Sequence, residues 1–112
     1  MPEIKSTFNV SYDPGATTEP LVNLIDAYRK GLTDYCRNAP EDYHLAAAYA
    51  QETYKLPRIA LETWSDPAET LYGAVCALRM AMEADENDDT EVVSAMLKAS
   101  LGYFEAAIAA TA

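Results

Sequence analysis

Three prolines limit where helices can begin in this chain of 112 residues. Pro20, Pro40 and Pro67 each stand at the start of a stretch whose apolar residues recur with the 3.6-residue period of an α-helix. Proline has no N–H group and is tolerated in the first helical turn, where that group has no intrahelical partner. A fourth periodic stretch follows the polar segment 85–89. The sequence therefore predicts an all-α fold, a small antiparallel bundle of about four helices joined by short loops.

The second predicted helix differs from the first in regularity. The first, residues 19–38, carries one continuous apolar stripe, whereas the second begins at Pro40 and meets Pro57 in its interior. Pro57 removes a backbone donor and clashes with the preceding turn, so we expect a kink or break near Leu56. A short helical piece over residues 58–64 should follow. The residues expected on the inner face of the second helix are Tyr43, Ala46, Ala47, Ala50 and Tyr54.

The third predicted helix has the clearest start signal. Asp66 can cap it, Pro67 takes the first position and Glu69 completes the spacing of a capping box. We therefore expect Asp66 to accept a hydrogen bond from the N–H of Ala68 or Glu69. The helix is apolar almost all round and should be the most buried of the four. Its main buried stripe is predicted to be Leu71, Ala74, Val75, Leu78 and Met82.

The fourth predicted helix runs from the polar segment 85–89 to about residue 110 and carries two apolar stripes. One stripe consists of large residues that are expected to face inward: Val93, Met96, Leu97, Phe104, Ala107 and Ile108. The other consists of small residues that suit close contact between helices: Ala95, Ala99, Gly102 and Ala106.

The chain divides into an extended N-terminal arm, residues 1–17, and a helical bundle domain, residues 18–112. In the arm, Phe8, Val10 and Tyr12 alternate with polar residues, and this places their side chains on one side of an extended segment. A single strand cannot form a sheet alone. The arm is therefore expected to cross to a second subunit, to lie along its own bundle or to stay loose.

The formal net charge of −10 disfavours partners that are themselves negatively charged. It argues against direct binding to nucleic acid and to anionic membrane surfaces. No apolar run approaches the ~20 residues of a membrane span, and residues 1–5 lack the apolar core of a signal peptide. These features predict a cytoplasmic protein without membrane attachment. Cys36 and Cys76 lie on apolar helix faces and are expected to be reduced core thiols.

Two short motifs have metal-like spacing, but neither is complete. Glu41 and His44 match Glu-x-x-His, yet a di-iron site needs two such motifs and the chain has one histidine. The acidic segment 85–89 resembles the start of a calcium loop, but Thr90 and Met96 occupy the positions where an EF-hand needs glycine and glutamate. The sequence also lacks a nucleophile near its histidine and a glycine-rich phosphate loop. We therefore predict no metal, no cofactor and no enzymatic activity.

Eight tyrosines are the most informative residues for function, because tyrosine is enriched at protein interfaces. The first hypothesis is a non-enzymatic helical interaction module, homodimeric or bound to another protein. Its candidate interface residues are Phe8, Val10, Tyr12, Tyr49 and Tyr103. A second hypothesis is an acidic inhibitor that mimics nucleic acid and occupies the basic cleft of a host defence or DNA-processing protein. A third is a small-ligand binder with a tyrosine-lined pocket between the helices.

Two segments carry a resemblance to other proteins. Residues 19–28, Glu-Pro-Leu-Val-Asn-Leu-Ile-Asp-Ala-Tyr, and residues 68–78, Ala-Glu-Thr-Leu-Tyr-Gly-Ala-Val-Cys-Ala-Leu, resemble the first and third helices of small all-helical proteins of bacteria and prophages whose function is uncharacterised. The resemblance implies a helical cytoplasmic protein of mobile-element origin. It implies no particular activity.

Overall fold

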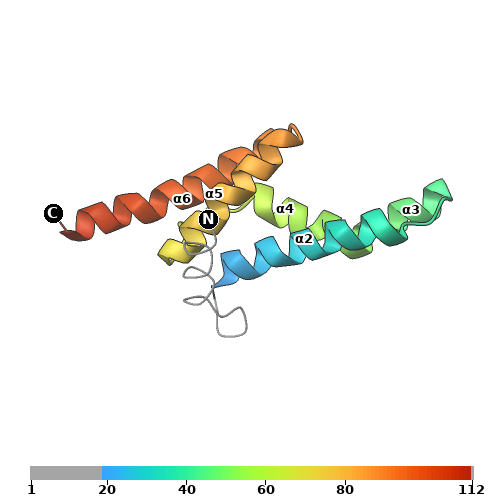
Figure 1. Ribbon diagram of the computed structural model, residues 1–112, viewed down its shortest axis with the longest axis horizontal. Helices are drawn as coiled ribbons and strands as arrows, with labels where there is room; N and C mark the ends of the chain where they lie inside the picture. Colours follow the sequence, from blue (N-terminus) through green and yellow to red (C-terminus); the bar gives the residue numbers. More distant parts are fainter. Residues whose placement is uncertain (1–18, 112) are drawn as a thin grey trace, which may run out of the picture.

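The computed structural model describes residues 19–111, and these residues are helical apart from short turns and loops (Figure 1). No strand occurs within this range. The predicted all-α antiparallel bundle is confirmed, while the arm of residues 1–17 lies outside the described residues. The elements are α2 (Pro20–Asn38), α3 (Tyr43–Ala50), the π-helical turn η1 (Gln51–Lys55), α4 (Leu56–Glu62), α5 (Leu71–Glu86) and α6 (Thr90–Thr111).

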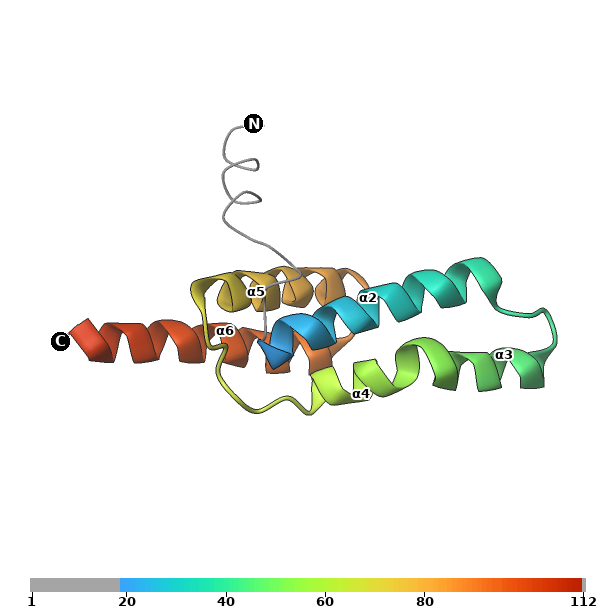
Figure 2. The same ribbon diagram turned by 90° about the horizontal axis from the view of Figure 1, so that it is seen from below.

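The helices form two antiparallel hairpins that cross. In the first, α2 runs beside the continuous stretch of α3, η1 and α4, and in the second α5 runs beside α6 (Figure 2). The hairpins meet where α2 and α4 pack against α5 and α6. The molecule is elongated, 56 × 30 × 25 Å, because the α3 end of the first hairpin and the C-terminal turns of α6 project in opposite directions (Figure 1).

The core between the hairpins joins a few large side chains to many small ones. Leu21 and Ile25 of α2, Leu61 of α4 and Met96 of α6 are fully buried. Small residues let helix backbones approach closely, and they supply most of the buried positions where α5 meets α6. These positions are Gly73, Ala74, Ala77, Ala81 and Ala84 on α5, and Ala95 and Ala99 on α6.

The predicted inner stripes of α5 and α6 were right at Met96, which is fully buried, but wrong at most of their other large residues. Leu78 is 43% exposed and Met82 is 66% exposed, and Leu97, Phe104 and Ile108 of α6 are also exposed. Both helices are apolar almost all round, so the periodicity of their sequences does not decide which face turns inward. The alanine-rich faces, with Met80 and Met96, pack toward the core, and the faces that carry the exposed large residues point away from it.

The predicted irregularity at Pro57 takes the form of the π-helical turn η1, which directly precedes it in the helix. Pro57 has no N–H to donate to the carbonyl of Thr53, four residues earlier. That carbonyl lies against Gly31 of α2, where a Cβ atom would collide with it. The glycine therefore permits close contact between α2 and η1 in the first hairpin.

The start of the second helix also differs from the prediction. It begins at Tyr43 rather than Pro40, and Asp42 caps it by accepting a hydrogen bond of 3.0 Å from the N–H of Leu45. Tyr43, predicted to face inward, is 81% exposed. Cys36 was predicted to be a core thiol, but it is exposed because the end of α2 projects beyond the core.

Helix α5 begins four residues later than predicted, at Leu71. Its cap is Thr70, whose hydroxyl accepts a hydrogen bond of 2.9 Å from the N–H of Gly73. Asp66 does not cap the helix, because both N–H groups expected to bind it have more distant partners. The N–H of Ala68 donates to the carbonyl of Ala99 at 3.0 Å, and the N–H of Glu69 donates to a carboxylate at the start of the first hairpin.

That carboxylate belongs to Glu19, the residue immediately before α2. It is 5% exposed, and its oxygens accept hydrogen bonds from the N–H of Glu69 at 2.6 Å and from the Thr70 hydroxyl at 2.7 Å. It also packs against Gly73, where a side chain would have no room. Glu19 thus joins the start of the first hairpin to the start of the second.

Candidate functional sites

Most of the exposed large apolar residues lie on the second hairpin, on the side of α5 and α6 that faces away from their packed alanines. Each helix carries four apolar residues there, spaced by four, three and four positions. We call this surface the outer face. It consists of Leu71, Val75, Leu78 and Met82 on α5 and of Leu97, Leu101, Phe104 and Ile108 on α6.

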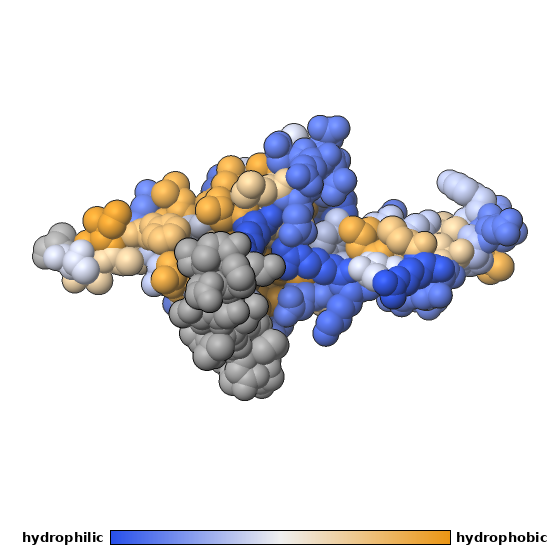
Figure 3. Space-filling view, in the orientation of Figure 1, coloured by the Kyte–Doolittle hydropathy of each residue, from blue (hydrophilic) through white to orange (hydrophobic). Residues whose placement is uncertain are grey.

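The two rows of the outer face lie on the same side of the hairpin. Met82 of α5 and Leu97 of α6 line one groove of about 390 Å³, together with Ala81 and Val93. Apolar surface covers much of α6 and of the hairpin, whereas the turn between α5 and α6 is hydrophilic (Figure 3). The two rows of the outer face therefore meet at the end of the hairpin near the turn.

The side chains of the outer face are well exposed. Seven of the eight are between 40% and 68% exposed. Large apolar patches on a protein surface commonly mark sites where another protein or a membrane binds. The outer face is therefore a candidate interaction surface.

Charge is distributed unevenly along this hairpin. Residues 83–91, around the turn, contain six acidic residues and no basic one, whereas residues 99–111 contain a single charge, Glu105. Asp85 and Glu86 flank the groove of the outer face. One end of the surface is therefore strongly negative, and the other is nearly neutral.

Helix α6 is apolar enough to be compared with a membrane span. Among the described helices, it alone has the length and composition to cross a bilayer, and 28% of its most apolar stretch is buried. The core helix of a globular domain can pass the same test. Here the apolar character has two sources, the alanine-rich face packed on α5 and the large residues of the outer face.

A second site, the tyrosine groove, lies where the turn between α5 and α6 meets the first hairpin. It has a volume of about 490 Å³. Its lining includes Tyr28, Leu32 and Tyr35 of α2, Tyr54 of η1, Arg58 of α4, and Asp88 and Asp89 of the turn. Burial raises the pKa of Tyr28, and the negative charge of Asp89 raises it further.

Arg58 connects the α4 side of this groove to the turn between α5 and α6. Its guanidinium donates to both carboxylate oxygens of Asp89, at 2.8 and 3.0 Å, and lies 3.3 Å from an oxygen of Glu62. The bonds to Asp89 raise the pKa of Arg58. Two carboxylates therefore surround this one positive charge.

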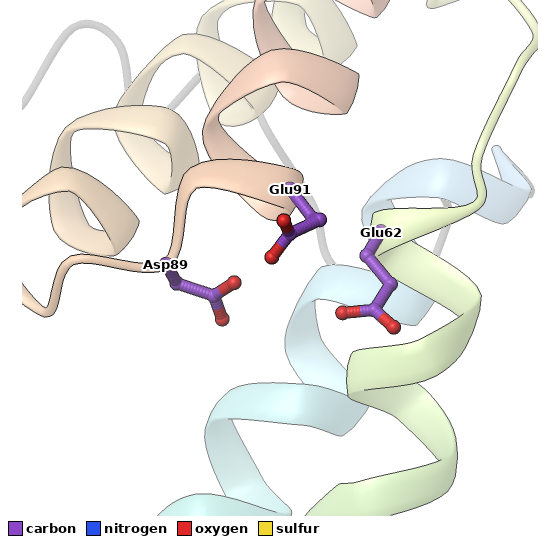
Figure 4. A group of neighbouring side chains, drawn as sticks. All are labelled: Glu62, Asp89 and Glu91. Atoms are coloured by element: carbon purple, nitrogen blue, oxygen red, sulfur yellow. The ribbon is translucent and has the colours of Figure 1, made fainter.

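Three carboxylates meet beside Arg58. Glu62 of α4 lies near Asp89 and Glu91 at the start of α6, and their oxygens approach within 4.8 Å of one another (Figure 4). Such a group could in principle hold a cation. Arg58 already pairs with Asp89 and Glu62, however, and so supplies positive charge to two of the three carboxylates.

Of the predicted interface residues, the structure describes Tyr49 and Tyr103, and they lie on different hairpins. Phe8, Val10 and Tyr12 lie outside the described residues. Tyr49 lies on α3, and its hydroxyl donates to Asp34 at 2.6 Å, which lowers the pKa of Asp34 and raises the pKa of Tyr49. Tyr103 of α6 packs against the core, with its ring 5.4 Å from that of Phe104.

Sequence reasoning missed the outer face as a site because it assigned most of those residues to the core. The signal was present in the repeated four–three spacing of both helices, which is the spacing of a coiled-coil seam. Comparison of the chain with models of protein families, with curated proteins and with solved structures finds no match. The evidence for function therefore comes from the geometry of the two sites.

Proposed function

We propose that this protein is a helical association module that forms a homodimer through the outer face of α5 and α6. The observation that carries the proposal is the pair of exposed seams, Leu71–Val75–Leu78–Met82 and Leu97–Leu101–Phe104–Ile108. A hairpin with such seams presents half of the core of a four-helix bundle. A second copy supplies the other half, because the same surface on both subunits makes a closed two-fold interface.

The charges favour one arrangement of the two hairpins. If both turns lay at the same end, Asp85 and Glu86 of one subunit would approach the same residues of the other, and like charges would repel. With the hairpins turned end for end, each acidic turn lies beside the nearly neutral C-terminal half of the partner's α6. The proposed dimer therefore has its acidic turns at opposite ends.

A lipid bilayer is the other partner that could cover an apolar helix face. The acidic turn argues against it, because Asp85 and Glu86 flank the groove and would be repelled by an anionic lipid surface. The four–three spacing of the large residues also suits packing against another helix, because side chains with this spacing insert between those of a facing helix. A lipid surface offers no such complementary shape. The acidic nucleic-acid mimic receives less support, because Glu83 and Asp89 are already paired with Arg29 and Arg58.

A matched pair of leucine substitutions tests the proposal. Leu101 is 55% exposed on the outer face, and Leu45 is 60% exposed on α3 at the far end of the molecule. Leu101→Glu should place a charge in the dimer core and yield monomers, whereas Leu45→Glu should leave the dimer intact. Multi-angle light scattering measures the mass, and circular dichroism checks that both variants keep the helical content of the unmodified chain.

Four results would overturn the proposal. The first is a dimer that Leu101→Glu does not weaken, and the second is an unmodified chain that stays monomeric at ~100 µM. The third is a monomer that sediments with phosphatidylcholine vesicles, which would identify a membrane as the partner. The fourth is a monomer that dimerises only after deletion of residues 1–18, which would show that this segment of the same chain covers the outer face.

A further inference from the structure

The tyrosine groove has the volume of a ligand site and lies apart from the outer face. About 490 Å³ falls within the range of ~300–1,000 Å³ typical of small-molecule sites. Three segments distant in sequence form it: α2, the helix around Tyr54 and Arg58, and the turn at residues 87–89. Its shape therefore depends on how the two hairpins cross.

Three tyrosines are among the residues that line the groove. The rings of Tyr35 and Tyr54 lie 5.1 Å apart at an interplanar angle of 73°, so they form a corner. Tyr28 lines the same groove. Tyr49, which does not line it, stacks on Tyr35 at 6.4 Å. Aromatic faces carry negative electrostatic potential and attract cations, most strongly where water is partly excluded.

The backbone holds the corner in place. Tyr54 belongs to the π-helical turn η1, and π-helical turns occur frequently at functional sites. The turn is fixed against α2 by the close approach of the Thr53 carbonyl to Gly31. Arg58, bonded to Asp89, fixes the rim from the other side. The aromatic corner is thus formed before any ligand arrives.

The negative charge of the groove favours a positively charged ligand. Among the residues that line it, Asp88 and Asp89 are negative, and Arg58 alone is positive. The guanidinium is neutralised by Asp89 and by Glu62. The whole chain has a net charge of −10. An anion would therefore be repelled, and a cation would gain charge attraction from the carboxylates that a neutral ligand lacks.

We propose that the tyrosine groove binds a small organic cation, an alkylated ammonium group, between the rings of Tyr35, Tyr54 and Tyr28. The ammonium group contacts the aromatic faces, and the carboxylate of Asp88 supplies a compensating charge at the rim. Such a group is weakly hydrated and of the size that aromatic corners accept. This site is independent of the proposed dimer.

A matched pair of probes tests the sign of the charge. Choline and its neutral isostere 3,3-dimethylbutan-1-ol have the same shape and differ in the charge of the central atom. We expect choline to shift the tyrosine ring signals of the full chain in NMR titrations at constant ionic strength, with a dissociation constant in the millimolar range. The isostere should bind at least tenfold more weakly. Equal binding of the two probes, or no binding of choline, would overturn the proposal.

Three variants locate the site. Tyr35→Leu should weaken choline binding at least fivefold, whereas Tyr35→Phe, which keeps the ring, should bind as the unmodified chain does. Because Tyr35 also contributes to packing, Asp88→Asn provides a second test with less risk to the fold. Asp88 has a φ of 58°, a conformation that asparagine also adopts readily. Choline binding unchanged in both Tyr35→Leu and Asp88→Asn would place the cation elsewhere and refute the assignment.

Discussion

Replacing Glu19 with alanine should destabilise the fold more than its position at the edge of α2 suggests. The carboxylate is 5% exposed and accepts hydrogen bonds at 2.6 Å from the N–H of Glu69 and at 2.7 Å from the Thr70 hydroxyl. Hydrogen bonds to a charged group contribute about 1.5–3 kcal/mol each. Glu69 and Thr70 are exposed residues, so both donors can return to water, and burial of the charge opposes part of the gain. We therefore expect a loss of about 2–3 kcal/mol, below the sum of the two bonds.

Glu19→Gln separates the shape of the side chain from its charge. The amide keeps one acceptor oxygen, so this variant should lose about 1 kcal/mol, less than Glu19→Ala. Urea unfolding monitored by circular dichroism at one fixed protein concentration measures both changes, with the exposed Glu41→Ala as control. If Glu19→Ala shifts the free energy of unfolding by no more than Glu41→Ala does, the link between the hairpins does not contribute to stability and the reasoning fails.

Two further predictions concern the first hairpin. Gly31→Ala should destabilise the fold by about 1–3 kcal/mol, because the new methyl group meets the carbonyl of Thr53. This loss should appear even though alanine favours an isolated helix by about 1 kcal/mol. A gain in thermal stability would contradict the close contact. The Tyr49 hydroxyl holds the pKa of Asp34 below its usual value, a stabilising effect that is present at neutral pH and lost as the pH falls through the pKa of the folded protein. Tyr49→Phe should therefore raise the pKa of Asp34 in a carboxyl-carbon NMR titration, and an unchanged value would refute the hydrogen bond as its cause.

The fold class could be predicted because local signals and packing agree in this chain. Pro20 is the first residue of α2, and the irregularity expected at Pro57 is present as a π-helical turn. The small stripe of α6 was also predicted correctly at Ala95 and Ala99, which are buried. These signals depend on residues close in sequence, which is why reading along the chain finds them.

The loss of the cap at Asp66 could not be predicted from local sequence, although Thr70 was a second possible cap. Asp66 has the spacing of a cap, but Glu19, fifty residues before Glu69, takes the N–H that Asp66 was expected to bind. A distant carboxylate of this kind leaves no local pattern. The same limit applies to the choice of buried face in α5, where Ala77 is buried and Leu78 is 43% exposed.

The candidate sites were predictable only in part. Reading the sequence placed Tyr28, Tyr35 and Tyr54 on helices, but their meeting in one groove depends on the crossing of the hairpins and on the turn at η1. The outer face could have been recognised from its spacing. The assumption that large apolar residues face inward concealed it, and that assumption fails when alanines allow two helices to pack closely.

Sedimentation equilibrium of the unmodified chain tests the central claim most directly, because the outer face either closes against a second copy or stays open. Data collected between ~5 and ~200 µM should fit a reversible association to twice the 12.3 kDa mass of one chain. The fraction of dimer should rise with concentration and fall when Leu101 is replaced by glutamate. A mass of 12.3 kDa across the whole range would contradict the account.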